Sequence, residues 1–461
     1  MNANWDNTYA SLPVEMYKKQ TPTPVTSPSG LALNNSLAEE LGISFDNDWF
    51  EYISGNKLPN GANPISQAYA GHQFGHWNPQ LGDGRAILLG EVIGSFGRVD
   101  LQLKGAGRTP WSRSGDGRAW YGPVLREYLV SEAMHALDIP TTRALAAAAT
   151  GEKILREQGP LPGAVLCRTA SSHIRVGTFQ FFASQNDLQS LQALFDYTIK
   201  RHFPKSKTIE DLLEQAVQKH ASLVANWMGV GFIHGVMNTD NSHIAGITID
   251  YGPCAFMDHF IPTKAFSSID RQGRYAYNNQ PKMAAWNLAQ LATALLPLAS
   301  ERESAIKRFT EIIHGFEDVF EKANSRVYSK KIGHEPSKKS NELTQTLLKM
   351  MAQQGADYTQ TFRALGEGKV DKYIGSHIDF PHWHESWSEG VNTEDLCQIN
   401  PAIIPRNHLI EEMINNAING DMELFNTLTS ALDTPFKNPK NSKLTMPPET
   451  NEVVAATFCG T

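Results

Sequence analysis

Two neighbouring stretches decide the fold: residues 232–241, Phe-Ile-His-Gly-Val-Met-Asn-Thr-Asp-Asn, and residues 247–252, Ile-Thr-Ile-Asp-Tyr-Gly. They combine Asp-Asn, a short apolar turn, and then Asp-aromatic-Gly after a predicted strand. Protein kinases place a base and two magnesium ligands with this arrangement. Asn241 and Asp250 offer the hard oxygen ligands that suit Mg²⁺ bridging phosphates. Asx turns alone would explain Asp240 and Asn241, but not the Asp-Tyr-Gly run in the same segment.

Upstream of these stretches, a predicted hairpin ends in a lysine. Two runs rich in Leu and β-branched residues, 86–93 and 99–104, flank a turn that contains glycine, which is typical of a β-hairpin. The second run ends in Lys104, beside small residues, where a lysine can meet phosphate oxygens. A helix is predicted over residues 123–137, and its Glu127 could hold Lys104 by an ion pair, as in kinases. The alternative is a surface lysine and a solvated helix face.

Two glycine-containing loops are candidates for holding phosphates. Gly82 and Gly84 lie in a Gly-Asp-Gly-Arg turn just before the hairpin. Glycine allows close backbone approach to a phosphate, and Arg85 adds a cationic fork. Plain turn chemistry is the competing interpretation. The second loop, Arg-Ser-Gly-Asp-Gly-Arg, contains Asp116 and Gly117 and either wraps an anion through its backbone N–H groups or is an ordinary surface loop.

Two arginines lie in apolar segments that we predict to be extended, at residues 163–168 and 174–182. Arg168 and Arg175 each need an anionic partner, because a guanidinium stays charged and is costly to bury unpaired. A structural salt bridge would meet that need, as would a bound ligand. We favour ligand binding, since several anion-seeking groups fall in the same part of the chain.

The order of the predicted elements indicates an α+β protein, since strands come first and helices follow. We predict a kinase-like fold of two lobes with an N-terminal arm and a helical C-terminal extension. The parts are an irregular arm at residues 1–60, a sheet-rich lobe for nucleotide at 61–185, a helix-rich lobe with the metal and catalytic motifs at 186–330, and the helical extension at 331–461.

Composition excludes several classes of protein. The net charge of -7 over 461 residues and the pI near 6.1 argue against general attraction to nucleic acid or anionic lipid. The chain has no signal peptide at its start and no run of apolar residues long enough to span a membrane. The four cysteines lack Cys-x-x-Cys spacing, which argues against a zinc site and fits a reducing compartment. We therefore expect a soluble, cytoplasmic protein.

Several motifs together resemble the selenoprotein O family of pseudokinase-like protein adenylyltransferases, in its bacterial cysteine form. The resemblance runs nearly end to end. It implies a kinase-like fold that binds ATP turned around relative to ordinary kinases, so that the α-phosphate faces the acceptor hydroxyl. AMP is then transferred and pyrophosphate leaves. The motifs lie at residues 69–75, 80–85, 103–107, 126–129, 234–241 and 405–408.

The resemblance also implies roles for single residues. Asp240 would be the proton acceptor, and Glu127 would orient Lys104. Asn241 and Asp250 would hold Mg²⁺ or Mn²⁺. The acceptors would be proteins bearing Ser, Thr or Tyr hydroxyls, with self-modification as a further expectation. The residues implied to hold ATP are Gly82, Gly84, Arg85, Lys104, Asp116, Gly117, Arg168, Arg175 and Asp250.

Members of this family are described as redox-sensitive through a C-terminal cysteine or selenocysteine, a position that Cys459 matches here. Some bacterial members pair it with a cysteine downstream of the Asp-Tyr-Gly run, but residues 258–273 contain none. A bridge to Cys254 would need a different geometry. Three other functions stay open from the sequence: a kinase that transfers the γ-phosphate, an ATP-binding scaffold without catalysis, and a thiol redox protein built on Cys459.

Overall fold

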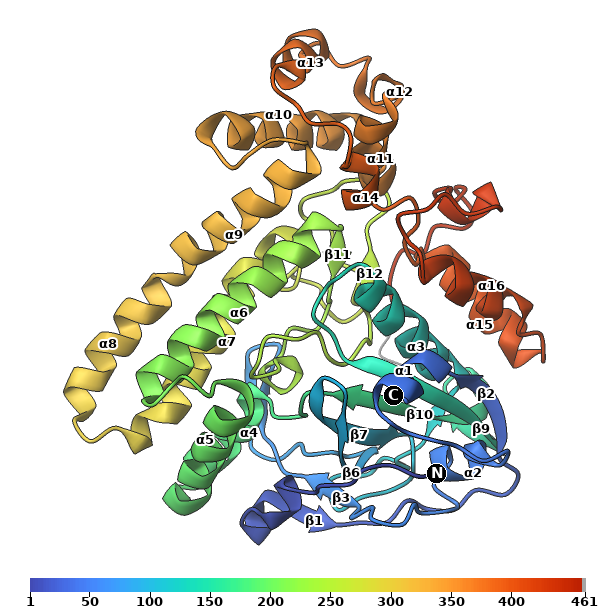
Figure 1. The fold of residues 1–461 in the computed structure, drawn as a ribbon, viewed down its shortest axis with the longest axis vertical. Helices are drawn as coiled ribbons and strands as arrows, with labels where there is room; N and C mark the ends of the chain where they lie inside the picture. The colour runs from blue at the N-terminus through green and yellow to red at the C-terminus, as the bar shows by residue number, and fades with distance from the viewer. Residues whose placement is uncertain (458–461) are drawn as a thin grey trace.

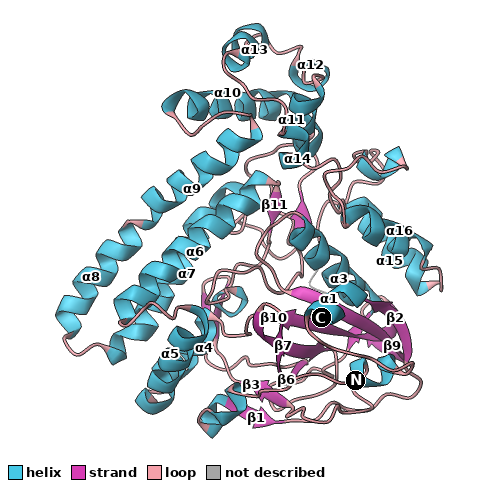
Figure 2. Ribbon diagram, viewed as in Figure 1, coloured by secondary structure: helices cyan, strands magenta, loops and turns pink. Residues whose placement is uncertain are grey.

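The main sheet is built around the predicted hairpin. The computed structural model describes residues 1–457, where β6 (Ala86–Gly94) and β7 (Gly97–Lys104) pair across a two-residue turn. Eight antiparallel strands follow the order β1, β3, β6, β7, β10, β9, β2, with β8 paired to β10. Figure 2 shows the strands of this sheet in magenta. The other strands are β1 (Tyr17–Lys19), β2 (Ser29–Leu33), β3 (Ile65–Gln67), β8 (Ala119–Trp120), β9 (Arg143–Arg156) and β10 (Gly159–Ala170).

Residues 1–60 are not the purely irregular arm that their composition predicts. Their strands β1 and β2 become the two ends of the sheet, paired with β3 and β9 respectively. The short helices α1 (Asn35–Glu40) and α2 (Trp49–Ile53) pack on β9. This segment therefore completes the sheet.

The sheet is buried on both faces, and its side chains alternate between them. Ile87 and Leu89 lie in one apolar cluster with Leu37 of α1. Leu88 lies in a second cluster with Leu125 of α3. Burial on both faces explains why the strand reads as a continuous apolar run in the sequence.

The helix α3 (Tyr121–Ala136) packs against β9 and β10, as Figure 1 shows. It confirms the helix predicted near residue 123 and begins two residues earlier. The extended segment predicted at residues 174–182 is wrong, because α4 (Val176–Ser184) occupies it. The side chains of residues 176–182 are buried all round, and a short helix of this kind has no polar stripe to distinguish it from a buried strand.

A capping box formed by Thr208 and Asp211 starts the helix α6 (Ile209–Gly229). Thr208 Oγ1 accepts a hydrogen bond from the Asp211 N–H at 3.1 Å, and the Asp211 carboxylate accepts from the Thr208 N–H at 3.0 Å. Two further helices, α8 and α9, are divided at Gly315. The helices of this part are α5 (Leu188–His202), α6 (Ile209–Gly229), α7 (Gln280–Leu295), α8 (Arg302–His314) and α9 (Phe316–Lys331).

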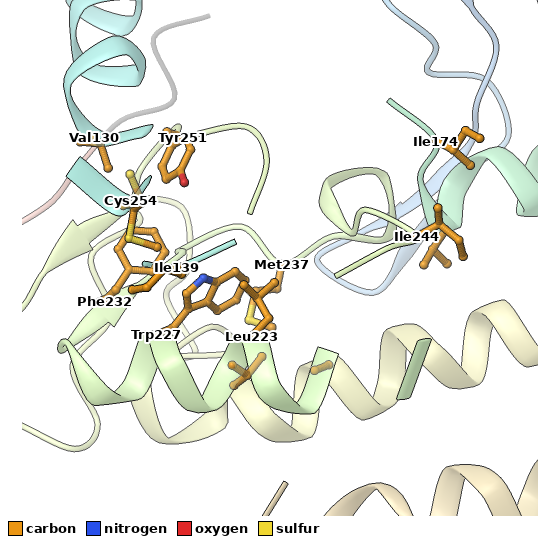
Figure 3. Close-up of a cluster of buried hydrophobic side chains, with 14 of the residues drawn as sticks. Val130, Ile139, Ile174, Leu223, Trp227, Phe232, Met237, Ile244, Tyr251 and Cys254 are labelled. Carbon is orange, nitrogen blue, oxygen red and sulfur yellow. The ribbon is translucent and has the colours of Figure 1, made fainter. Parts of the chain in front are cut away.

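The two stretches that decided the fold lie between β11 (Phe232–Ile233) and β12 (Ala255–Phe256), which pair antiparallel. A short 3-10 helix, η3 (Thr239–Asn241), sits in the first loop. Figure 3 shows the apolar floor beneath these loops, where Trp227 of α6 lies near Met237. This packing holds both polar clusters on a rigid base.

The C-terminal region packs against earlier parts of the chain. α15 and α16 pack against α3, and Thr457 donates its hydroxyl to the Pro253 carbonyl at 2.6 Å. Within residues 1–457, the helices are all too short or too polar to cross a membrane. The remaining helices are α10 (Lys338–Gln354), α11 (Tyr358–Glu367), α12 (Asp371–Ile374), α13 (Phe380–Ser388), α14 (Leu396–Ile399), α15 (Asn407–Ile418) and α16 (Glu423–Leu432), with short 3-10 helices at Tyr9–Ser11, Val14–Met16, Tyr277–Asn279, Leu296–Leu298 and Ser442–Thr445.

Candidate active site

Three cations converge on the carboxylate of Asp250. Lys104 Nζ lies 3.0 Å from Asp250 Oδ1, and Arg168 Nη1 lies 2.5 Å from the same oxygen. Arg175 pairs with the other oxygen, Oδ2. Lys104 ends β7, Arg168 lies on β10 and Arg175 directly precedes α4. The structure thus brings cations from the early strands to the late Asp-Tyr-Gly motif.

A second carboxylate completes this charge cluster. Glu127 of α3 pairs with Lys104, and its other oxygen lies 3.0 Å from Arg168 Nη1. The predicted Lys104–Glu127 ion pair is therefore present. Among the groups in direct ion pairs, three cations face two carboxylates, which leaves one net positive charge within this set of five. A buried site with excess positive charge favours an anionic ligand.

Asp250 is held ionised in an unusual backbone conformation. Burial by itself would raise its pKa, but the charges of Arg168, Arg175 and Lys104 outweigh burial and hold the pKa well below its ordinary value. Its φ of 63° is left-handed, a region in which Asp and Asn are more common than other side chains. Backbone strain of this kind is concentrated at functional sites.

The Gly82–Arg85 turn lies beside this cluster. Gly82 adopts φ 66° and packs so closely on Trp111 that a Cβ would lie 2.4 Å from the indole ring. Gly84 is tight against the Trp111 carbonyl in the same way. The Arg85 carbonyl accepts from the Gly105 N–H at 2.7 Å, which ties the turn to the end of β7. A small cavity here is lined by Arg85, Lys104, Ala119, Pro123, Val124, Glu127 and Leu166.

The loop with Asp116 and Gly117 is joined by its backbone to the segment after β7. The Gly117 carbonyl accepts from the Gly107 N–H at 3.0 Å, close to the end of β7. The Asp116 carboxylate instead pairs with Arg156 at 2.8 Å, and its side chain is 48% exposed. Asp116 therefore sits at the rim, away from the three cations.

Asp240 is linked to Asp250 through Arg175, whose Nη1 donates to the Asp240 carbonyl at 2.5 Å. The Asp240 carboxylate is buried, and Gln73 Nε2 donates to its Oδ2 at 3.0 Å. Within residues 1–457, Oδ1 has no hydrogen-bond partner. Burial raises the pKa of Asp240 to about 6, although the Gln73 hydrogen bond and Arg175 lower it in part. A buried carboxylate with one free oxygen can accept a proton from a bound group.

Comparison with known proteins identifies the family of this chain. The family described as "Protein adenylyltransferase SelO" matches residues 1–433. The chain belongs to the SelO family. Among relatives called protein nucleotidyltransferase YdiU, one from Ruegeria sp. (strain TM1040) is 54% identical over 467 residues, and one from Methylorubrum extorquens (strain PA1) is 49% identical over 492 residues; each alignment covers 99% of both chains. The chain is therefore a nucleotidyltransferase.

The donor set of this SelO-family site fits a magnesium ion bound together with a nucleotide. Among residues 1–457, no group of three or more His, Cys, Asp or Glu side chains could hold a metal ion without other ligands. Mg²⁺ is commonly held by one or two carboxylates together with substrate phosphates, and Asp250 supplies an ionised carboxylate. Asn241 Nδ2 donates to the Val236 carbonyl at 3.0 Å, which leaves the amide oxygen available. Asn241 and Asp250 are thus reasonable ligands.

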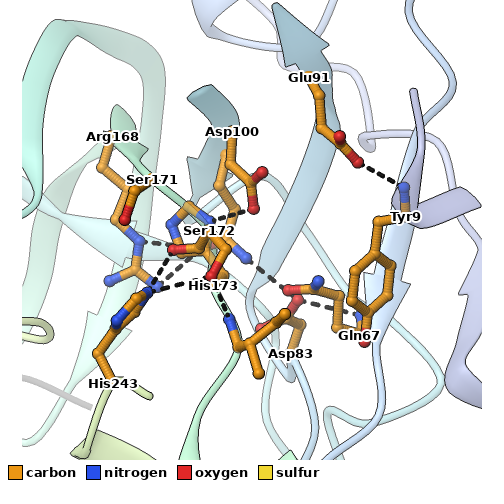
Figure 4. A network of polar contacts seen from close by, with 12 residues as sticks. Tyr9, Gln67, Asp83, Glu91, Asp100, Arg168, Ser171, Ser172, His173 and His243 are labelled. Carbon is orange, nitrogen blue, oxygen red and sulfur yellow. Dashed lines mark hydrogen bonds and ion pairs between the residues drawn. The ribbon is translucent and has the colours of Figure 1, made fainter. Parts of the chain in front are cut away.

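Sequence reasoning missed two glutamines in the SelO-family site. Gln102 of β7 accepts from Arg168 Nε at 2.9 Å and donates to the buried Asp83 at 3.1 Å, and Figure 4 shows the network around Asp83 and Arg168. The available signal was a polar residue between two leucines on a buried strand. Gln73 lies in the 69–75 motif, but its contact with Asp240 joins residues far apart in the chain.

Only some of the predictions about cysteines concern residues that the structure describes. Among residues 1–457, Cys254 is buried and has no disulfide partner, and burial raises the pKa of its thiol to about 12. A thiol with a raised pKa is poorly reactive. Cys459 lies outside the described residues, so its expected redox role stays a prediction.

Proposed function

We propose that this site transfers AMP from ATP to Ser, Thr or Tyr hydroxyls of proteins and releases pyrophosphate. Membership of the SelO family supports a nucleotidyltransferase. The observation that carries the proposal is the convergence of Lys104, Arg168 and Arg175 on Asp250. Three fixed cations beside an ionised carboxylate are what a triphosphate with its metal requires.

We propose a kinase-like arrangement of these parts. The Lys104–Glu127 pair joins the hairpin strand to α3, as the corresponding pair does in kinases. The Asp-Tyr-Gly motif then supplies Asp250 from the other side. Residues 61–185 would form the nucleotide lobe and residues 186–330 the catalytic lobe.

The chemistry is a displacement at the α-phosphorus. The acceptor oxygen forms a bond to the α-phosphorus while the bond to the bridging oxygen of pyrophosphate breaks. The hydroxyl proton passes to the free oxygen of Asp240, and Arg168 and Arg175 stabilise the negative charge that develops on the phosphoryl oxygens. Mg²⁺ or Mn²⁺ held by Asn241 and Asp250 would supply further charge neutralisation at the phosphates.

The proposed nucleotide residues divide by their position. Lys104, Arg168, Arg175 and Asp250 form the charge cluster itself. Arg85 lines the adjoining cavity, and the glycines 82, 84 and 117 allow close backbone packing around it. Asp116 is proposed at the rim, where it would reach the nucleotide only after leaving Arg156. We also propose a cytoplasmic location, since ATP is the donor and the described cysteines are free.

Labelled ATP tests this function. The full chain is incubated with a protein acceptor, Mg²⁺ or Mn²⁺, and ATP labelled at either the α- or the γ-phosphate. AMP transfer predicts label from the α-phosphate only, and mass spectrometry then locates each adenylyl group, including any on the protein itself. A Lys104→Met variant should lose the label. Label from the γ-phosphate alone would identify a kinase and reject the proposal.

A further inference from the structure

The hairpin of β4 (Gly71–Gln73) and β5 (His76–Asn78) lies directly against the loop that carries Asp240. The His72 N–H donates to Thr239 Oγ1 at 2.7 Å, beside the Gln73 contact with Asp240 described above. This hairpin is therefore the wall of the site nearest to the candidate proton acceptor.

An aromatic and basic surface continues from this wall. We define the acceptor patch as His72, Trp77, Arg274, Lys282 and Trp286. The His72 ring lies 4.9 Å from Trp77 and 5.3 Å from Trp286. The Arg274 guanidinium lies 4.8 Å from the Trp286 ring. Lys282 is exposed and precedes Trp286 by one turn of α7, so both residues lie on the same side of that helix.

Arg274 differs from the arginines of the charge cluster because it has no acidic partner. Among residues 1–457, no carboxylate lies within ion-pair distance of its guanidinium, whereas Arg168 and Arg175 both pair with Asp250. The nearby Asp270 instead accepts hydrogen bonds from the backbone N–H groups of Arg274 and Tyr275, at 2.9 and 2.8 Å. Within the described part of the chain, the Arg274 Nε is buried and has no hydrogen-bond partner. A partly buried guanidinium in this state favours an incoming anion.

The patch is open to solvent at its edge, and it is joined to the catalytic loop at its base. Trp77 is 39% exposed. Tyr275, next to Arg274, donates its hydroxyl to Asn238 Oδ1 at 2.7 Å, two residues before Asp240. A segment bound to the patch would therefore approach the proposed proton acceptor. The cations proposed to hold the triphosphate, Lys104, Arg168 and Arg175, lie in the charge cluster and not in this patch.

We propose that the acceptor patch binds the protein substrate through an acidic segment next to the hydroxyl that receives AMP. This inference rests on the proposed function and adds a substrate class to it. Arg274 and Lys282 would pair with Asp or Glu side chains of the acceptor, while Trp77 and Trp286 would pack against its apolar atoms. The overall charge of the chain is -7, so a local basic patch is needed to attract acidic segments.

The test measures binding apart from catalysis. Short fluorescent peptides with one Tyr flanked by Glu, or by Lys, are titrated with the full chain in the absence of ATP and metal, and anisotropy is recorded. The Glu-flanked peptide should bind about three- to tenfold more tightly than the Lys-flanked peptide, as one or two partly exposed charge pairs provide. Arg274→Gln should abolish this preference, and Arg274→Lys should keep most of it.

The matched control is Arg302→Gln, which removes an exposed arginine at the start of α8 and should leave the preference unchanged. Equal binding of the two peptides by the wild type, or an unchanged preference in Arg274→Gln, would overturn the inference. Circular dichroism confirms that each variant is folded. If binding shows the preference but no peptide or protein receives α-label, the acceptor patch stands and the proposed AMP transfer fails.

Discussion

The substitution Asp250→Asn removes one charge from the centre of the site and keeps its shape. The side chain is 18% exposed, whereas those of Arg168 and Arg175 are each 2% exposed. Without Asp250, three cations face Glu127 alone, so the net charge of the cluster rises from one to two. Breaking a buried ion pair by removing one partner costs about 3–5 kcal/mol, and we expect a loss of this size in the free energy of unfolding.

The backbone at Asp250 allows the charge and the conformation to be separated. Asn tolerates the left-handed φ of 63°, whereas Asp250→Ala should lose about 1–2 kcal/mol more because its Cβ is strained there. Urea unfolding without nucleotide measures both differences. Glu389→Gln is the control, because Glu389 forms an ion pair with Lys339 in which both side chains are well exposed, and it should leave the urea midpoint unchanged.

The Asp250→Asn variant should be less stable than the wild type, but its affinity for metal-free ATP should not fall. The phosphates of metal-free ATP can replace the missing carboxylate, so ATP should raise the urea midpoint of the variant at least as much as that of the wild type. Metal-dependent AMP transfer, measured with α-labelled ATP, should fall by about 1000-fold because a fixed electrostatic contact is lost. Unchanged stability together with near-normal, metal-dependent transfer would refute the assignment of Asp250.

Three further substitutions test separate parts of the structure. Gly71→Ala would place a Cβ 2.6 Å from Asp240 Oδ1; AMP transfer should fall by about 100-fold with ATP affinity unchanged by calorimetry, and full transfer would show that the position of this carboxylate is unimportant. Burial lowers the pKa of Lys331 from 10.5 to about 7. Between these pH values the unfolded chain therefore holds a proton that the folded protein has released. The free energy of unfolding should rise with pH in this range by about 1.4 kcal/mol per pH unit. Lys331→Met should lose that slope in urea unfolding and be more stable at pH 7, and an unchanged slope would contradict a neutral buried amine. Arg406→Met should lower the free energy of unfolding in urea by about 3–5 kcal/mol, because it leaves Asp258 and Asp357 without their cation. A loss below about 1 kcal/mol would mean that these ion pairs contribute no more than exposed ones.

The parts of the site that the sequence predicted are those specified by short-range patterns. The 86–104 hairpin and α3 follow from local periodicity and turn residues, and they bring Lys104 to Glu127. The resemblance placed both Lys104 and Asp250 at the nucleotide, but their direct contact across 146 positions was not predicted. Local patterning could not predict α4, because a helix that is buried on almost every side carries no clear polar and apolar period.

Contacts between distant segments were beyond prediction from one sequence. Gln73 reaches Asp240 across 167 positions, and nothing near either residue indicates the other. Asp116 is a second example, because the sequence of its loop predicted a ligand contact but did not indicate Arg156, 40 positions away, which pairs with its carboxylate. In both cases the partner depends on how the whole chain folds.

The C-terminal helices belong to the site as much as the two motifs do. Arg126 of α3 pairs with Glu411 of α15, next to the residue that holds Lys104. Arg406, which is 1% exposed, pairs with Asp258 shortly after the Asp-Tyr-Gly motif, and with Asp357 at the start of α11. Because one side of the charge cluster rests on α3 and the other on the segment after Asp250, the same C-terminal region fixes both sides relative to each other.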